Sequence, residues 1–385
     1  MEDILYLDEQ LTVEEKLTRD SVKRFVEDEV MPGIANQYEK GEFDRSLIKK
    51  AGQLGLLGMT LPVQAGGSGA SQVAYGLACQ ELERGDSGLR SFVSVQSSLC
   101  MYPIFAFGSD EQKIRYLPQM ATGSCLGAFG LTEPDSGSDP ANMKTNAKKV
   151  DGGYILNGAK MWITNATLAD IAIVWAKDES NMIRGFIVEK KFAGYKANEI
   201  KHKLSLRASI TGEIVLEDCF VPNENVLPNT NGLSSALACL TNARYGIAWG
   251  ATGAAIACYD IALKYATERI GFGKPIASFQ LVQRDLADMF LSIVKTQTLN
   301  LQIGRLKDRD RANYVMISMA KMNACKEALN IARMARNILG ANGISLEYHV
   351  IRHMNNLESV FTYEGTDNMH SLIIGRHITG ISAFS

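Results

Sequence analysis

The sequence is poor in cysteine, and none of its cysteines forms a C-x-x-C pair. The seven cysteines, at positions 79, 100, 125, 219, 239, 258 and 325, stand mostly among small apolar residues such as Ala238 and Ala324. Such surroundings are typical of reduced core thiols rather than of disulfides or metal ligands. We therefore expect no metal site and a reducing compartment, either the bacterial cytoplasm or the mitochondrial matrix after removal of a leader.

An excess of one charge and a long apolar run are also missing. The net charge is −2, with 21% charged residues, and Lys and Arg are spread evenly along the chain. This distribution argues against a nucleic-acid partner, which would favour a basic stripe. No charged-then-apolar leader precedes Leu5, and no uninterrupted apolar run approaches the ~18 residues of a membrane span. We expect no integral membrane segment.

A third absence is the G-x-G-x-x-G fingerprint of dinucleotide-binding folds. The nearest pattern, Gly250-Ala-Thr-Gly253, has the wrong spacing and lies in a stretch with helical periodicity. Small residues there favour close packing between helices rather than a phosphate-binding turn. Any nucleotide cofactor must therefore be held in another way.

The pattern of apolar residues divides the chain into three parts. Thr12-x-x-Glu15 and Ser109-x-x-Gln112 have the form of helix capping boxes, and residues 12–128 have mainly helical spacing. Strand-like runs follow between residues 154 and 216, and the helical period returns from residue 233. A chain of 385 residues is expected to form two or three domains. We predict an α+β protein with an all-α domain at 1–128, a β domain at 129–230 and a helical bundle domain at 231–385.

Three motifs stand out against this background: Phe129–Pro140 (FGLTEPDSGSDP), Lys160–Asn165 (KMWITN) and Tyr363–Thr366 (YEGT). Together, in this order, they resemble the acyl-CoA dehydrogenase family, and the resemblance covers nearly the whole chain. It implies an N-terminal helical domain, a middle β-barrel-like domain and a C-terminal four-helix bundle. It also implies FAD, removal of two hydrogens across Cα and Cβ of an acyl-CoA thioester, a homotetramer, and an electron-transfer flavoprotein as the partner that reoxidises the flavin.

The resemblance implies a set of cofactor-binding residues. The family positions that contact FAD fall on Phe129, Leu131, Thr132, Gly137, Ser138, Trp162, Thr164, Arg269, Phe272, Gln280, Asn337, Leu339, Gly340, Ala341, Thr366, Asn368 and Phe384. In the family the counterpart of Arg269 reaches the pyrophosphate of a neighbouring subunit. Taken alone, the first motif could be an ordinary loop with a tight turn at Gly137-Ser138, and Trp162 a core residue.

Glu364 is the candidate catalytic base. Removing a proton α to a thioester requires a carboxylate that is close to Cα and desolvated, so that its pKa rises. Gly365, which follows, lets main-chain N–H groups approach a ligand oxygen. From the residues alone Glu364 could also be an acid at a helix start. The resemblance places the base at this position, with hydride leaving Cβ for flavin N5.

The acyl group is indicated by the segment Glu81–Ser91 (ELERGDSGLRS), which resembles the glutaryl-CoA dehydrogenase branch of the family. There the counterpart of Arg90 binds the terminal carboxylate of the substrate, and an Arg among apolar residues is costly to bury without an anionic partner. The resemblance implies the following substrate-binding residues: Glu83, Arg90, Ser91, Ser94, Ser138, Thr241, Asn242, Arg244 and Tyr363. Arg244 alone could equally be a surface ion pair.

Tyr363 favours the decarboxylating outcome, because relatives that retain the carboxylate carry Val before the base. The expected reaction is conversion of glutaryl-CoA to crotonyl-CoA and CO2, a step of lysine and tryptophan degradation. Three alternatives remain open at this point. The chain could stop at glutaconyl-CoA, it could oxidise a short-chain acyl-CoA with Arg90 in a structural role, or it could be an inactive CoA-binding scaffold.

Overall fold

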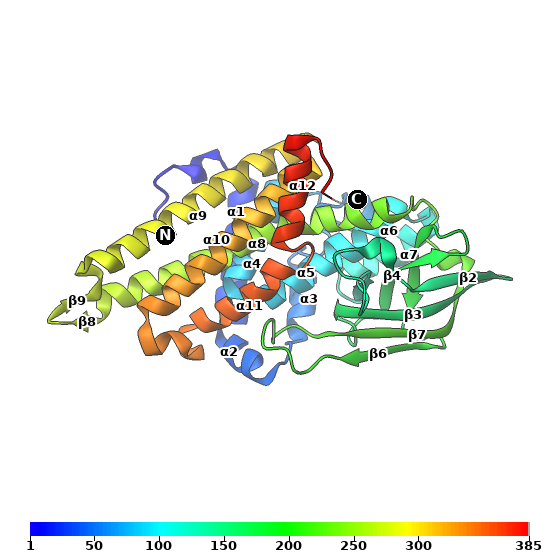
Figure 1. The fold of residues 1–385 in the computed structure, drawn as a ribbon, viewed down its shortest axis with the longest axis horizontal. Helices are drawn as coiled ribbons and strands as arrows, with labels where there is room; N and C mark the ends of the chain where they lie inside the picture. The colour runs from blue at the N-terminus through cyan, green and yellow to red at the C-terminus, as the bar shows by residue number, and fades with distance from the viewer. Residues whose placement is uncertain (384–385) are drawn as a thin grey trace.

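Helices of the two ends of the chain pack together, and a β-sheet lies to one side of them (Figure 1). The computed structural model describes residues 1–383. The N-terminal part contains α1 (Val13–Phe25), α2 (Met31–Lys40), α3 (Ser46–Gln53), α4 (Gln72–Gly85), α5 (Ser87–Ser94), α6 (Tyr102–Phe107) and α7 (Asp110–Ala121). Both predicted capping boxes are present, at the starts of α1 and α7. The sequence signal for these two helix starts is confirmed.

One seven-stranded sheet follows. Its strands are β1 (Gly127–Gly130), β2 (Asn146–Val150), β3 (Gly153–Thr164), β4 (Ile171–Asp178), β5 (Ile183–Glu189), β6 (Tyr195–Glu199) and β7 (Thr211–Pro222). The hydrogen-bonded order is β1-β4-β2-β3-β7-β6, and β5 pairs with the other side of β4. The predicted strand-like runs all lie in these strands. The predicted runs do not include β1, β2 and β6. β1 has only four residues, and β2 and β6 are short, polar and largely exposed, so their hydrophobic alternation is weak.

The C-terminal part is helical. It contains α8 (Leu233–Glu268), α9 (Gln280–Lys307), α10 (Tyr314–Ile338), α11 (Val350–Thr362) and α12 (Asp367–Thr379), with a small hairpin, β8 (Ile270–Gly271) and β9 (Lys274–Pro275), between α8 and α9. α8 packs against both α4 and α10. A Cβ built on Gly253 of α8 would lie 1.9 Å from the main-chain oxygen of Gln80, so the predicted close helix packing is confirmed at Gly253.

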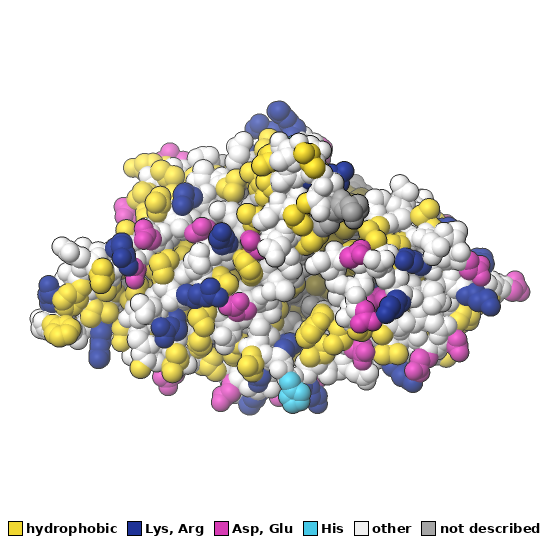
Figure 2. All heavy atoms as spheres, viewed as in Figure 1, with side chains coloured by type: hydrophobic (Ala, Val, Ile, Leu, Met, Phe, Trp, Pro, Cys, Tyr) yellow, Lys and Arg dark blue, Asp and Glu magenta, His cyan; other side chains and the backbone are white. Residues whose placement is uncertain are grey.

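The fold class predicted from the sequence is confirmed, with helical N- and C-terminal parts and a central sheet. The exact domain boundaries stay a prediction; β1 begins at Gly127 and α8 at Leu233. All seven cysteines are buried and free, as expected. Burial raises the pKa of the Cys79 thiol to about 12, which keeps it protonated. Figure 2 shows Lys and Arg interspersed with Asp and Glu over the face in view.

One helix differs from the expectation about apolar stretches. α8 is long enough to cross a membrane and contains an 18-residue window of mean hydropathy 1.3. Within the protein, 78% of that window is buried, and the helix packs against α4 and α10. Polar residues such as Asn242 and Arg244 interrupt the apolar residues of α8, so the sequence contains no uninterrupted apolar run there. The length and hydropathy of α8 are those of a core helix between two helical layers.

Candidate active site

The loop between α11 and α12 carries Glu364 and is held from two other helices. Arg244 of α8 donates from Nε to the main-chain oxygen of Glu364 at 2.6 Å. Lys321 of α10 donates from Nζ to the oxygens of Gly365 at 2.8 Å and Phe361 at 3.2 Å. Glu364 itself has φ +51°, a left-handed conformation that typically costs about 1–3 kcal/mol in a residue with a side chain. Two buried cations thus fix a strained loop in one conformation.

The Glu364 carboxylate has the properties of a poised base. Its Oε2 is buried and accepts no hydrogen bond from residues 1–383. Burial raises the pKa of Glu364, while the positive charges of Arg90, Arg244 and Lys321 partly oppose the rise. A desolvated carboxylate with a free oxygen can accept a proton from a carbon acid.

Arg90 of α5 lies in a buried polar cluster with two partners. The Arg90 side chain is fully buried, and its Nε donates to Glu83 Oε2 of α4 at 2.5 Å. Its Nη2 donates to the Tyr363 hydroxyl, one residue before the candidate base. Burial alone would lower the pKa of Arg90, but the charge of Glu83 raises it well above the ordinary value, so the guanidinium stays charged.

Several polar atoms of this cluster have no partner. Within the described part of the chain, Arg90 Nη1, Glu83 Oε1 and Ser94 Oγ are buried and make no hydrogen bond. Unpaired buried polar atoms are uncommon in native proteins, and they call for an explanation such as an absent ligand. A guanidinium with an unused terminal nitrogen suits an anionic oxygen. The arrangement can therefore hold a negatively charged group while a neighbouring carboxylate acts as a base.

Arg244 is buried, with 9% of the residue exposed. The alternative that it forms a surface ion pair is therefore wrong. Its neighbours on α8, Thr241 and Asn242, donate from their side chains to carbonyls one turn earlier in the same helix. Ser91 is buried on α5, whereas Ser138 is exposed in the loop after β1. The structure does not bring Thr241, Asn242 and Ser138 into hydrogen-bond contact with the Arg90 cluster.

Two of the sequence motifs meet at the edge of the sheet. The Met161 N–H of β3 donates to the Thr132 oxygen at 2.8 Å, which joins the Leu131–Thr132 segment to the strand carrying Trp162 and Thr164. Lys160 is buried beneath them and donates to Leu131 O at 3.3 Å. Trp162 is 58% exposed and has φ +63°. The alternative that Trp162 is a core residue is therefore wrong.

Lys160 is paired with Glu133, an interaction that the sequence reading missed. Lys160 Nζ donates to Glu133 Oε1 at 2.8 Å, and both side chains are buried. Burial lowers the pKa of Lys160 to about 8, although Glu133 opposes this shift. Burial would raise the pKa of Glu133, but its bond to Lys160 and other donors lowers it below the ordinary value. The pair holds the loop that carries Leu131 and Thr132.

The first motif consists of a buried aromatic residue at the end of β1 and the loop that follows it. Phe129 is buried and packs edge-on against Trp175, with ring centroids 6.2 Å apart. A reciprocally hydrogen-bonded turn joins Glu133 to Ser136, and proline at its second position presets the φ required there. The chain then bends at Gly137-Ser138, as expected, and the Ser136 hydroxyl donates to the Asp139 oxygen across this bend at 2.6 Å. Gly137 itself has no neighbouring atom within 4 Å of a built Cβ among the described residues.

Seven of the predicted cofactor residues lie at the far end of the helical bundle. Figure 1 shows the β8–β9 hairpin and the junction of α8 with α9 at the end of the molecule opposite the sheet. Asn342 donates to the Tyr265 hydroxyl at 3.1 Å, which ties the segment after α10 to the same end of α8. This end carries the predicted set Arg269, Phe272, Gln280, Asn337, Leu339, Gly340 and Ala341. One chain therefore keeps its two groups of predicted cofactor residues apart.

Accessibility differs within this far group. Phe272 is 97% exposed, with φ +52°, whereas the Leu339 side chain is buried. Near the active site, Thr366 caps α12 by accepting from the Met369 N–H at 3.3 Å, and Asn368 is exposed. Phe384 lies outside the described residues.

The sequence reading missed two further groups near the site. Lys321 is buried on α10 together with Ile317, Ala324 and Ala328, and a lysine at this apolar helical spacing was the available signal. The second group is Asp86, whose Oδ1 accepts from the Gly88 N–H at 2.7 Å at the start of α5. Its Oδ2 accepts from Asn356 Nδ2 at 3.0 Å and from Arg352, both on α11. Asp86 thus joins the helix of Arg90 to the helix that leads to Glu364.

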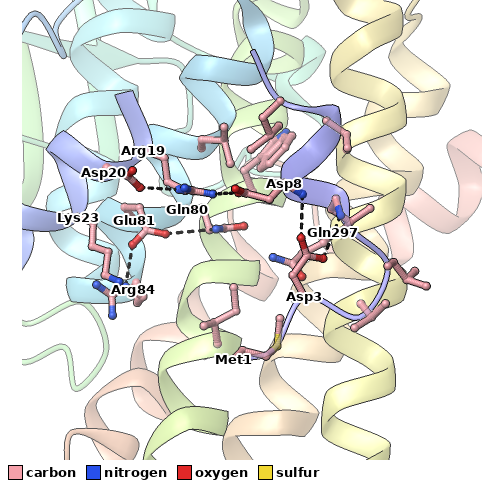
Figure 3. A pocket seen from close by; sticks show the side chains of 18 of the residues that line it. Met1, Asp3, Asp8, Arg19, Asp20, Lys23, Gln80, Glu81, Arg84 and Gln297 are labelled. Carbon is pink, nitrogen blue, oxygen red and sulfur yellow. Dashed lines mark hydrogen bonds and ion pairs between the residues drawn. The ribbon is translucent and has the colours of Figure 1, made fainter. Parts of the chain in front are cut away.

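One cavity of the molecule lies away from these residues. A cavity of about 280 Å³ lies beneath the N-terminal segment and is lined by α1, α4, α8 and α9. Figure 3 shows Arg19 between Asp8 and Asp20 in this cavity, with Gln80 and Glu81 beside them. Its described lining contains none of the predicted site residues. We assign the active site to the Glu364 cluster because the unpaired buried groups of opposite charge gather there.

Comparisons with known proteins give a consistent result. Family models for the N-terminal, middle and C-terminal domains of acyl-CoA dehydrogenases match residues 12–124, 128–219 and 230–379. A crystal structure of glutaryl-CoA dehydrogenase from Mycobacterium smegmatis is 52% identical with a TM-score of 0.98, covering 100% of this chain and 99% of that one. Another glutaryl-CoA dehydrogenase structure from that organism, in complex with FADH2, is 47% identical with a TM-score of 0.97, covering 99% and 98%. A probable acyl-CoA dehydrogenase of Bacillus subtilis (strain 168) is 38% identical over 96% of this chain and 99% of its own length.

Proposed function

The chain belongs to the acyl-CoA dehydrogenase family, and we propose that it is a glutaryl-CoA dehydrogenase that oxidises and decarboxylates glutaryl-CoA to crotonyl-CoA and CO2. The observation that carries this proposal is the fully buried Arg90, whose Nη1 has no partner within residues 1–383. Glu83 already pairs with the Arg90 charge, but a simple acyl chain would leave Nη1 without a hydrogen-bond partner, whereas the terminal carboxylate of glutaryl-CoA would supply one. The similarity to two glutaryl-CoA dehydrogenase structures supports the same substrate.

FAD is the proposed cofactor, and the complex of one relative with FADH2 supports it. The indole of Trp162 is exposed beside Thr132 and Thr164, and stacking on a flat aromatic ring is more favourable for it than contact with water. Leu131, Thr132, Trp162 and Thr164 would hold the ring. The bound flavin supplies a hydride acceptor for the substrate Cβ.

We assign the first proton transfer to Glu364. Its free, desolvated carboxylate oxygen would take the proton from Cα of the thioester. Arg244 and Lys321 hold the main chain on both sides of this carboxylate, so its position would not change during the transfer. The main-chain N–H of Glu364 would stabilise the thioester oxygen as negative charge develops there.

Decarboxylation follows from how the substrate carboxylate would be held. Once the α–β bond is unsaturated, the thioester can stabilise the electron pair that remains when CO2 leaves the γ carbon. Glu83 and Tyr363 already use two nitrogens of Arg90, which weakens its attraction for the substrate carboxylate. The protonated Glu364 would then return its proton to the γ carbon and give crotonyl-CoA.

The oligomer and the electron acceptor complete the proposal. The separation of the two cofactor groups within one chain supports a homotetramer in which the far group of one subunit completes the flavin site of another. The proposed electron acceptor, an electron-transfer flavoprotein, rests on the family resemblance alone. A reducing compartment, the bacterial cytoplasm or the mitochondrial matrix, agrees with the seven free cysteines.

The decisive experiment adds glutaryl-CoA and an artificial electron acceptor to the purified protein and identifies the products by mass. Crotonyl-CoA and CO2 are the expected products. Glutaconyl-CoA would retain the substrate and refute decarboxylation, whereas turnover of butyryl-CoA alone would refute the role of Arg90. A matched variant, Arg90→Met, should lose turnover of glutaryl-CoA while retaining that of butyryl-CoA.

A further inference from the structure

A glycine of α8 faces the buried pair of Glu83 and Arg90. A Cβ built on Gly250 would lie 2.1 Å from Glu83 Oε2 and 3.0 Å from Arg90 Nε. These two atoms are the acceptor and the donor of the 2.5 Å bond that fixes the guanidinium. The first distance is far below any normal contact between a carbon and an oxygen. A side chain at position 250 is therefore incompatible with this pair in its observed position.

The other glycines on the same part of α8 meet different atoms. A Cβ on Gly253 would lie 1.9 Å from the main-chain oxygen of Gln80, so that glycine is required by the approach of two helix backbones. A Cβ on Gly246 would lie 2.9 Å from the Tyr75 hydroxyl and 3.2 Å from Cys79 Sγ. Gly250 is the one of these three positions whose nearest contacts are the charged ends of the Glu83–Arg90 pair. Its requirement for glycine comes from the polar cluster rather than from helix packing.

We propose that Gly250 is a specificity-determining residue that selects acyl groups ending in a carboxylate. The space left by its missing side chain lets Glu83 bind Arg90 Nε, and this bond fixes the orientation of the guanidinium that carries the unpaired Nη1. With a methyl group at position 250, the Glu83 carboxylate must move away from Arg90. The guanidinium then loses its fixed orientation, and a buried carboxylate without its partner repels the carboxylate of the substrate. This inference rests on the proposed function. Gly250 acts through Glu83 and Arg90 and does not itself contact the reacting atoms of the substrate.

The first test compares two substrates in the Gly250→Ala enzyme. We expect kcat/KM for glutaryl-CoA to fall at least tenfold relative to kcat/KM for butyryl-CoA, which has no terminal carboxylate. Gly246→Ala is the matched control, because it lies one turn away on the same helix and its nearest atoms are outside the Glu83–Arg90 pair. That control should leave the ratio of the two kcat/KM values unchanged. A merely structural role of Gly250 would lower both values together.

A second variant keeps the proposal testable if Gly250→Ala does not fold. In Gly250→Ala/Glu83→Asp the carboxylate is one methylene shorter and withdraws from the new methyl group. We expect the double variant to fold and to recover part of the preference for glutaryl-CoA. Failure of the double variant to fold would place the clash elsewhere and overturn the inference.

The outcomes separate this inference from the proposed function. If the unaltered protein does not oxidise glutaryl-CoA, the proposed function fails and this inference fails with it. If the unaltered protein prefers glutaryl-CoA and folded Gly250→Ala keeps the same preference, only the role of Gly250 is refuted.

Discussion

The loop around Glu364 and the far end of the helical bundle leave opposite kinds of groups without partners. Around the loop, the unpaired atoms within residues 1–383 are buried and polar, including Arg90 Nη1, Glu83 Oε1 and Glu364 Oε2. At the far end, large apolar side chains are exposed, with Phe272 at 97% and Ile270 at 59%.

The two kinds of group are satisfied by different partners. An unpaired buried polar atom costs about 1–3 kcal/mol, and a small charged ligand can pair with it. Exposed apolar surface gains roughly 25 cal/mol per Å² when it is covered, which requires a second surface. Under the proposed function, this difference predicts that substrate binds at the Glu364 loop and that the far end contacts another subunit and its cofactor. Four predictions test this division.

The largest effect is expected at the Glu364 loop. Glu364→Gln keeps the shape of the side chain but removes its basicity, so the rate of flavin reduction by glutaryl-CoA should fall about 10²–10⁴-fold while the substrate still binds. Stopped-flow absorbance and calorimetric binding measure the two quantities. The control is Glu358→Gln on α11, where the exposed carboxylate pairs with Arg333, and it should behave like the unaltered enzyme. Near-normal bleaching of the flavin in Glu364→Gln would remove this residue from the mechanism.

The second prediction concerns the far end. Phe272→Ala removes an exposed aromatic side chain, and we expect about tenfold weaker retention of FAD together with partial dissociation of the oligomer, because covering such a side chain is worth about 1.5–3 kcal/mol. Cofactor content after gel filtration and sedimentation velocity are the measurements. Ile114→Ala on α7, which is 77% exposed, is the matched control. Equal FAD content and equal mass for Phe272→Ala and Ile114→Ala would contradict a special role of the far end.

The third prediction concerns the partition between products. Tyr363→Val removes the hydroxyl that accepts from Arg90 Nη2, so Arg90 should hold the substrate carboxylate more tightly. The ratio of glutaconyl-CoA to crotonyl-CoA should rise about tenfold, since a hydrogen bond to a charged group is worth about 1.5–3 kcal/mol. Tyr363→Phe keeps the ring and should act in the same direction if the hydroxyl is responsible. An unchanged product ratio in both variants would exclude Tyr363 from the decarboxylation step.

The smallest expected effect is a shift in pH dependence. Burial raises the pKa of Glu364, and Arg244 lowers it. The base must be ionised to act, so kcat should fall as the pH falls through this raised pKa, above the ordinary value of 4.5. Arg244→Gln removes the opposing charge, and the acid limb of the kcat profile should move to higher pH. Arg333→Gln on the surface of α10 should leave the profile in place. A shift to lower pH in Arg244→Gln would contradict the proposed electrostatics.

Much of the fold was predictable because its signals are local. The capping boxes at Thr12 and Ser109 and the apolar strand runs involve residues only a few positions apart, and all of them are confirmed. The polar strands β2 and β6 were missed because pairing with their neighbours, rather than their own hydrophobicity, makes them strands.

For the active site, the sequence by itself determined which residue types are present and in which motifs they occur. Glu364 and Arg90 were therefore named from sequence, and the buried Oε2 atom of Glu364 and the buried side chain of Arg90 agree with their predicted roles. The tertiary structure alone decided that Tyr363 contacts Arg90 across 273 residues of sequence, that Lys321 holds the loop of Glu364, and that Gly250 leaves room for Glu83. These relations depend on how distant helices pack, and clearances of about one ångström between their side chains have no local sequence signature.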